Sequence, residues 1–411
     1  MTRRRRILFV IKNLQQGGTE RQILRMMASL DPQKFETALC TLSPEIHYRG
    51  VPQGEPRFSF QAKGAAAVRA VRSAIAEFQP DLVHSFRDGV NRVVWRALGS
   101  TSTGPAWLMS VRGRPILPLD LLWARFMHKR AYRVTVNSVG VQAALHRYSG
   151  VARTKMQVIA NLIDESTFRA PSTEERREAR QQLGLPQDAF VWVLPARMSW
   201  VKNQIGLVLS LAILKRRGAL SPDVEVVLAG RQRDWLASKI VPTLARVLGV
   251  RSHLRIFGAF TDPSVLYRAS DALVLPSWAE GMPNVVLESL LSAVPAVVTH
   301  QANRDDLVRH GKSGFTVRTG SPVALADAMS RLMQLPPEAR HRLGESGRWA
   351  LIQRFARGPV VATLSSLYET AIAANRLQRA KAANPVFSKA ALATPAPEGP
   401  LQDSALNQIS V

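Results

Sequence analysis

Glu280 and Glu288 bracket a segment, Gly281-Met282-Pro283-Asn284 followed by three apolar residues, whose composition suits anion binding. The apolar run before Glu280 and the proline after it predict a strand, a loop, and a helix that begins at Pro283 or Asn284. The N–H groups at the start of such a helix, together with its dipole, favour an anion such as a diphosphate. In that setting Glu280 can accept hydrogen bonds from sugar hydroxyls, and Glu288, about one turn into the helix, can bind a ribose diol.

The segment from Glu280 to Glu288 resembles the donor-binding Glu-x7-Glu motif of glycosyltransferase family 4. The similarity extends to Ser270-Asp-Ala-Leu-Val-Leu-Pro-Ser277 before it and to Ser289-Leu-Leu-Ser-Ala-Val-Pro295 after it, and further elements follow in the family's order over roughly residues 6 to 370. The resemblance implies a GT-B fold, in which two Rossmann-like α/β domains face a central cleft. It also implies that Glu280 acts in catalysis and that Glu288 and the four residues from Gly281 to Asn284 bind the donor.

Arg197 and Lys202 follow an apolar run, Val193-Leu-Pro-Ala, that resembles the family's first strand of the C-terminal domain. The resemblance implies that these two fixed cations stabilise the charge that develops on a leaving nucleoside diphosphate. No Asp-x-Asp metal loop follows a strand of the N-terminal half, so we expect no metal and no other cofactor. Asp305 and Asp306 are expected as helix-start or surface acids.

The N-terminal half carries weaker elements of the same resemblance. Gly17 and Gly18 resemble the family's glycine loop, where the backbone can approach donor and acceptor. His84 ends a predicted strand and is expected to face the cleft as a catalytic residue, and Asn161 lies in Asn161-Leu-Ile-Asp164, which resembles a segment near the domain junction. Arg112 stands where many relatives have a histidine that touches the donor sugar. This departure leaves the identity of the sugar open, and Arg112 could bind a phosphate or a carboxylate.

Alternating strands and helices must position these residues. Apolar runs predict strands at residues 6–11, 36–42, 81–85, 106–111 and 132–137, with helices at 20–30, 65–77, 90–98 and 119–130, and a second set of strands at 190–194, 224–228, 254–257, 272–275 and 296–298. This pattern is typical of doubly wound α/β domains, in which ligands bind outside the carboxyl ends of the strands.

We predict an N-terminal acceptor-binding domain at 1–170 and a C-terminal nucleotide-sugar-binding domain at 171–355, joined by a linker that enters a helix capped by Ser172 or Thr173. A helix at 356–380 should cross back to the first domain. Residues 381–411 contain few large apolar side chains and are predicted to be disordered.

The chain has 411 residues, with 55 Lys and Arg against 30 Asp and Glu, an excess of 25 positive charges. Such an excess attracts polyanions, so an anionic membrane, nucleic acid, or an arginine-rich composition without functional meaning all remain open. Arg3 to Arg6 form a cluster that could face lipid, and no nucleic-acid-binding signature accompanies the charge. We therefore expect peripheral contact with an anionic membrane and no nucleic-acid partner.

A single cysteine, Cys40, excludes an internal disulfide and suits a reducing compartment. No apolar run is long enough to span a bilayer, and the run at 7–11 is too short for a signal peptide. These features predict a cytoplasmic protein, and the expected membrane contact would place it peripherally on the inner face of the cytoplasmic membrane.

The expected function is retaining transfer from a nucleotide sugar to a saccharide or lipid-linked saccharide in cell-surface polysaccharide synthesis, such as that of lipopolysaccharide or exopolysaccharide. Two alternatives remain open. One is a transferase or phosphorylase that acts on a soluble sugar, and the other is a non-catalytic protein that binds sugar nucleotides or polyanions.

Overall fold

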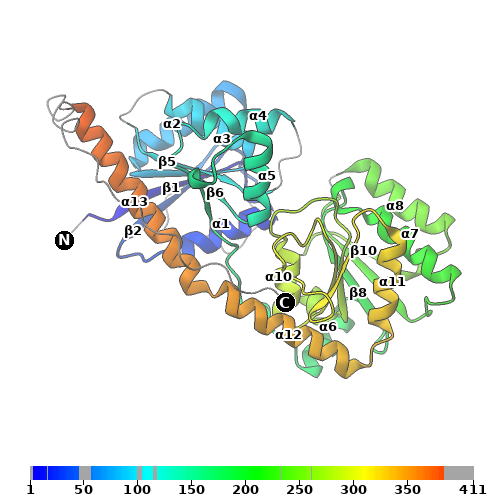
Figure 1. Cartoon of the computed structure of the whole chain (residues 1–411). Helices are drawn as coiled ribbons and strands as arrows, with labels where there is room; N and C mark the ends of the chain where they lie inside the picture. Colours follow the sequence, from blue (N-terminus) through cyan, green and yellow to red (C-terminus); the bar gives the residue numbers. More distant parts are fainter. Residues whose placement is uncertain are drawn as a thin grey trace, which may run out of the picture.

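The computed structural model describes residues 3–15, 17–45, 57–99, 104–113, 118–232, 234–260 and 262–383. Within these ranges the chain forms two α/β units, and a long C-terminal helix packs on the first of them (Figure 1). Residues 384–411, which make up nearly all of the tail predicted to be disordered, lie outside the described part.

The first sheet has seven strands in the order β3-β2-β1-β4-β5-β6-β7, and every neighbouring pair is parallel. Its strands are β1 (Arg5–Ile11), β2 (Phe35–Thr41), β3 (Arg57–Ser59), β4 (Leu82–Phe86), β5 (Ala106–Val111), β6 (Arg133–Val136) and β7 (Met156–Val158). The connecting helices are α1 (Gly18–Ser29), α2 (Gly64–Phe78), α3 (Asp88–Leu98), α4 (Pro118–Met127) and α5 (Val139–Ser149). The sequence did not predict β3 and β7, because three residues are too few to show a period.

The second sheet has six parallel strands in the order β10-β9-β8-β11-β12-β13. They are β8 (Phe190–Pro195), β9 (Val224–Ala229), β10 (Leu254–Phe257), β11 (Ala272–Leu275), β12 (Ala296–Thr299) and β13 (Gly314–Val317), of which β13 was not predicted. Its helices are α6 (Thr173–Gln182), α7 (Gln204–Arg216), α8 (Trp235–Val247), α9 (Ser264–Arg268), α10 (Asn284–Leu291), α11 (Pro322–Met333) and α12 (Pro337–Phe355).

In each sheet the strand order reverses beside the first strand, between β1 and β4 and between β8 and β11. Such a reversal opens a crevice at the carboxyl ends of the strands, where open α/β sheets bind ligands. The segment that follows β8 carries Arg197 and Lys202, and the loop that follows β11 carries Glu280 and leads into α10, which carries Glu288. Both loops therefore lie at the switch point of the second sheet.

Helix α6 joins the second sheet through Asp271, the residue that precedes β11. Its carboxylate accepts a hydrogen bond from the Val191 N–H at 2.8 Å and pairs with Arg176 at 2.7 Å and Arg180 at 2.8 Å, both on α6. The helix begins at Ser172, whose hydroxyl and Glu175 form a capping box, which confirms the predicted cap. This buried cluster fixes the start of the second unit on its sheet.

Helix α13 (Arg357–Ala383) packs on the first sheet, although it follows the last helix of the second unit (Figure 1). Leu364, Leu367, Tyr368, Ala371 and Ile372 of this helix are buried against residues of β1, β2, β4 and β5. The C-terminal helix thus returns the chain from the second unit to the first.

Candidate functional site

Lys202 and Glu280 meet at the carboxyl ends of β8 and β11, with the Lys202 Nζ 2.5 Å from Glu280 Oε1. The two loops that carry them run side by side. The Trp278 N–H donates to the Val201 carbonyl at 2.9 Å, and the Asn203 amide donates to the Pro276 carbonyl at 3.1 Å. Both charged side chains are mostly buried, so each lowers the desolvation cost of the other.

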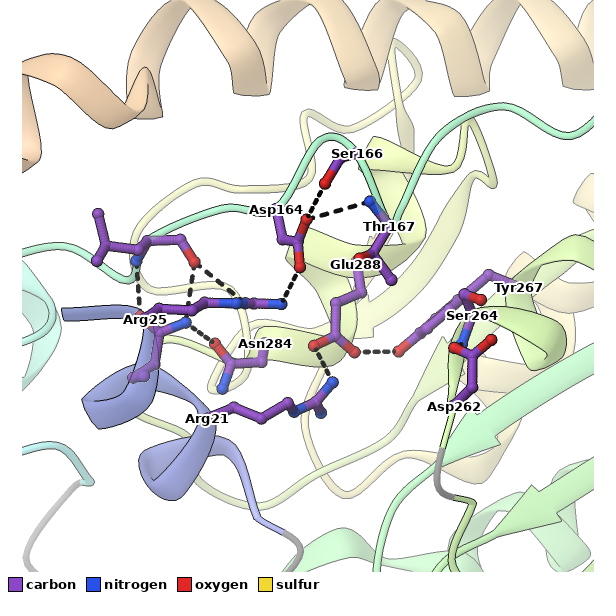
Figure 2. A network of polar contacts seen from close by, with 12 residues as sticks. Arg21, Arg25, Asp164, Ser166, Thr167, Asp262, Ser264, Tyr267, Asn284 and Glu288 are labelled. Carbon is purple, nitrogen blue, oxygen red and sulfur yellow. Dashed lines mark hydrogen bonds and ion pairs between the residues drawn. The ribbon is translucent and has the colours of Figure 1, made fainter. Parts of the chain in front are cut away.

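Glu288 lies at the centre of a second polar network, shown in Figure 2. Its Oε2 accepts a hydrogen bond from the Tyr267 hydroxyl at 2.9 Å, and its Oε1 pairs with the Arg21 guanidinium at 2.8 Å. Burial beside this carboxylate raises the pKa of Tyr267 well above its ordinary value, which keeps the hydroxyl a donor. Arg21 belongs to α1, so this ion pair joins the two α/β units.

Sequence reasoning missed both Arg21 and Tyr267. Arg21 follows the glycine loop, and its position in the first turn of α1 could have marked it as a residue that faces a ligand or the other domain. Tyr267 is one aromatic residue in an apolar helix, and nothing in its local pattern separates it from ordinary core.

The amino end of α10 faces the first unit. Pro283 is the N-cap and Asn284 the first helical residue, so the helix starts at the later of the two predicted positions. Asn284 Oδ1 accepts hydrogen bonds from Gln22 at 3.2 Å and from Asn161 at 2.6 Å, and the Met282 carbonyl accepts from Asn161 at 3.1 Å.

Two glycines allow this close approach. A Cβ at Gly281 would stand 2.5 Å from the Arg112 carbonyl oxygen, and one at Gly18 would stand 2.3 Å from the Asn284 amide nitrogen. At Gly281 the contact is with backbone, so a side chain there would force the units apart, whereas at Gly18 the Asn284 side-chain amide could turn away. Gly17 is the N-cap of α1 and Gly18 its first residue, so the pair lies where the chain enters the helix.

Asn161 and Arg112 bridge the units in this structure rather than facing open space. An Arg112 guanidinium nitrogen donates to Asn161 Oδ1, and the Asn161 amide donates to Met282 and Asn284 as described above. Burial lowers the pKa of Arg112 to about 10. The side-chain oxygen and both amide hydrogens of Asn161 are already engaged. The predicted contact of Asn161 with a nucleotide sugar would therefore require these hydrogen bonds to rearrange.

His84 does not face the cleft, and the prediction that it does is wrong. The ring is buried, with Nδ1 2.9 Å from the Tyr368 hydroxyl and Nε2 3.1 Å from the Thr135 hydroxyl, and it packs against Phe9 and Phe86. Burial, with a smaller contribution from Arg112, lowers its pKa well below the ordinary value. His84 is a neutral core residue that anchors α13 to the first sheet.

Arg197 lies between β8 and the Lys202 loop and is exposed, while its carbonyl accepts a hydrogen bond from the Gln204 amide at 2.9 Å. It thus shares the rim of the second sheet with Lys202. Asp305, expected at a helix start or on the surface, is instead buried and accepts a hydrogen bond at 2.8 Å from the Val139 N–H, at the start of α5 in the first unit.

No group of three or more His, Cys, Asp or Glu side chains among the described residues could hold a metal ion. Within the same residue ranges, no helix has the length and apolar character needed to cross a bilayer.

The two facing parallel-sheet units, with polar loops meeting between them, define a GT-B protein. Among solved structures, Anabaena Alr3699/HepE in complex with UDP and glucose aligns with a TM-score of 0.76 and 20% identity, covering 89% of this chain and 100% of that one. WaaG, a glycosyltransferase involved in lipopolysaccharide biosynthesis, aligns with a TM-score of 0.71 and 14% identity over 88% and 99% of the two chains.

The chain belongs to glycosyltransferase family 4. Residues 16–167 match the model described as Glycosyltransferase Family 4, and residues 175–349 match that of Glycosyl transferases group 1. EpsD of Bacillus subtilis (strain 168) is named as a glycosyltransferase. It is 29% identical to this protein over 206 residues, or 50% of this chain. That match spans 52% of EpsD, about half the length of the relative.

Proposed function

We propose that the protein transfers a glycosyl unit from a nucleotide sugar to a hydroxyl of a saccharide or lipid-linked saccharide, with retention at the anomeric carbon. The observation that supports this best is the meeting of Lys202 and Glu280 at the switch point of the second sheet. Family membership gives the reaction class, and HepE, which shares the fold, was solved with UDP and with UDP-glucose. WaaG supports a role in cell-surface polysaccharide synthesis.

In this proposal Lys202 and Arg197 neutralise the diphosphate as its bond to the sugar breaks, and no metal ion is required. Glu280 positions the sugar through its hydroxyls. The departing phosphate oxygen accepts the proton of the attacking hydroxyl on the same face of the sugar, so the reaction needs no separate protein base. The contacts that Gly18, Asn161 and Gly281 make between the units exclude water from the reacting bond.

Arg21 gives this scheme a further requirement. Its guanidinium pairs with the Glu288 carboxylate, which we assign to binding of the ribose. A bound donor must therefore share Glu288 with Arg21 or displace Arg21 from it. A displaced Arg21 would be able to pair with the donor diphosphate. Arg21 would then contribute a cation from the opposite side of the cleft.

A melting-temperature screen tests the proposal. UDP, GDP and ADP, each with a hexose conjugate, are added at millimolar concentration, and one nucleotide series should raise the melting temperature of the wild type by several degrees because it binds only the folded state. The Glu288→Gln variant should lose most of that shift, whereas Glu345→Gln on α12 should keep it. Failure of all three series to shift the wild type would reject a nucleotide-sugar donor.

We further propose that the protein contacts an anionic membrane through α4. Leu119, Leu122 and Phe126 are 58%, 52% and 51% exposed, and their spacing of three and four places them on one face of the helix. Arg125 and Lys129 are also exposed beside them. An apolar stripe flanked by cations is typical of helices that lie in the interface of an anionic bilayer.

Three of the four N-terminal arginines take part in ion pairs within the protein. Arg4 and Arg6 pair with Glu36 at 3.7 and 3.4 Å, and Arg5 pairs with Glu369 of α13 at 2.9 Å. Three arginines thus share two carboxylates, and Arg3 and Arg4 are exposed, so the cluster keeps part of its positive charge.

Replacing Leu122 and Phe126 together by serine should weaken partition onto phosphatidylglycerol vesicles by about tenfold, because less apolar surface enters the bilayer. Flotation with the vesicles measures this partition. Leu377→Ser, at an exposed leucine of α13, serves as the control and should change it little, and a double substitution of Arg4 and Arg5 measures the share of the N-terminal cluster. A wild type that stays off these vesicles, or arginine substitutions that weaken partition more than the α4 pair does, would contradict the assignment.

A further inference from the structure

Two exposed tryptophans lie beside the Lys202–Glu280 pair. Trp200 is 47% exposed and Trp278 is 50% exposed, and each precedes one member of the pair by two residues along the chain. Water solvates large aromatic faces poorly, so exposed rings gathered next to a polar site indicate a surface that binds a ligand.

The backbone holds the two residues on adjoining segments. The Trp278 N–H donates to the carbonyl of Val201, the neighbour of Trp200, at 2.9 Å. The Trp278 ring lies against Gly320, where an added Cβ would stand 2.6 Å from the ring, and the φ of 78° at Gly320 is in the left-handed region that favours glycine. A glycine at this position therefore leaves room for the Trp278 indole.

We propose that Trp200 and Trp278 form a binding surface for a pyranose ring next to Glu280. The axial C–H bonds on one face of a pyranose carry slight positive charge and pack against the electron-rich face of an indole. The equatorial hydroxyls then remain free at the ring edge, where the Glu280 carboxylate accepts hydrogen bonds and an indole Nε1–H can donate one. Aromatic side chains thus supply apolar contact, and Glu280 supplies orientation.

Other exposed tryptophans do not share this setting. Trp235 lies on α8 with Lys239 4.4 Å from the centre of its ring, so a cation already occupies a face of that indole. Trp349 is 67% exposed on α12, and no pair of oppositely charged residues lies beside it among the described contacts. Trp349 therefore provides a matched control.

The pyranose that binds this surface is either the sugar of the donor or a unit of the acceptor, and calorimetry separates these sources. The inference rests on the proposed function. The donor arm compares the affinity of UDP, GDP and ADP with that of UDP-glucose, GDP-mannose and ADP-glucose. The acceptor arm titrates p-nitrophenyl hexosides into protein saturated with the nucleoside diphosphate that binds.

Trp278→Ala and Trp200→Ala should each lower one of two affinities by about tenfold. The affected affinity is either that for the sugar nucleotide, relative to its nucleoside diphosphate, or that for the glycoside. Affinity for the nucleoside diphosphate alone should stay within about twofold, Trp278→Phe should restore most of the loss, and Trp349→Ala should change nothing. Unchanged affinity for both sugar ligands would overturn the inference. A wild type that binds no nucleoside diphosphate would instead reject the proposed function, so the two failures are distinguishable.

Discussion

Replacing Lys202 with alanine should lower kcat for glycosyl transfer by about 10²–10³-fold, the effect of removing one preorganised group from a developing negative charge. The ammonium group is mostly buried at the carboxyl end of the second sheet and already aligned on Glu280. A water molecule that fills the vacated space would have to reorient as the leaving group gains charge. The change should appear mainly in kcat, because the cation matters most in the transition state.

Steady-state assays of release of the nucleoside diphosphate measure this effect, and circular dichroism checks that the fold is intact. Lys239→Ala is the matched control, since it removes the same charge from an exposed site on α8, where the ammonium covers Trp235. Turnover of the Lys202 variant within about threefold of wild type would remove Lys202 from the mechanism and leave Arg197 as its candidate cation.

The second large effect concerns stability. Asp271→Ala should lower the free energy of unfolding by about 3–5 kcal/mol, because it removes one partner from a buried charge pair. Arg180 is only 2% exposed and would lose the carboxylate that compensates its charge, while Arg176 and the Val191 N–H would lose an acceptor. Water cannot reach this site readily to replace those bonds.

Urea unfolding compares Asp271→Ala with Asp327→Ala. Asp327 pairs with Arg217 at 2.5 Å, but both side chains are exposed, and exposed pairs contribute about 1 kcal/mol or less. Similar losses in the two variants would show that burial of the Asp271 cluster does not set its contribution, and would refute the prediction.

Much of the fold could be predicted from the sequence because the strands and helices of parallel α/β units have recognisable local sequence patterns. Each long strand is a compact apolar run, and several helices begin at a side chain that caps them, as Ser172 illustrates. The motif from Glu280 to Glu288 is likewise local, since strand, loop and helix follow one another without a gap. Short strands such as β3, β7 and β13 escaped because they carry no recognisable period.

The His84 prediction failed for a physical reason. A strand side chain can point to either face of its sheet, and apolar composition on both faces gives no sign of which one. His84 points to the face that α13 covers, and its partner Tyr368 is 284 residues away. A helix that returns from the far end of the chain therefore decides whether this imidazole meets ligand or core.

By itself the sequence determined the class of fold, the loops that carry the charged groups, and the residues Lys202, Glu280 and Glu288, because each depends on neighbours close in the chain. Only the tertiary structure decided that Arg21 reaches Glu288, that Gln22 reaches Asn284 across 262 residues, and that Trp200 and Trp278 share one rim. Those contacts depend on the order of strands in each sheet and on the approach of two separate units. Local periodicity in the sequence carries no information on strand order or on the approach of the units, since both arise only when the whole chain packs.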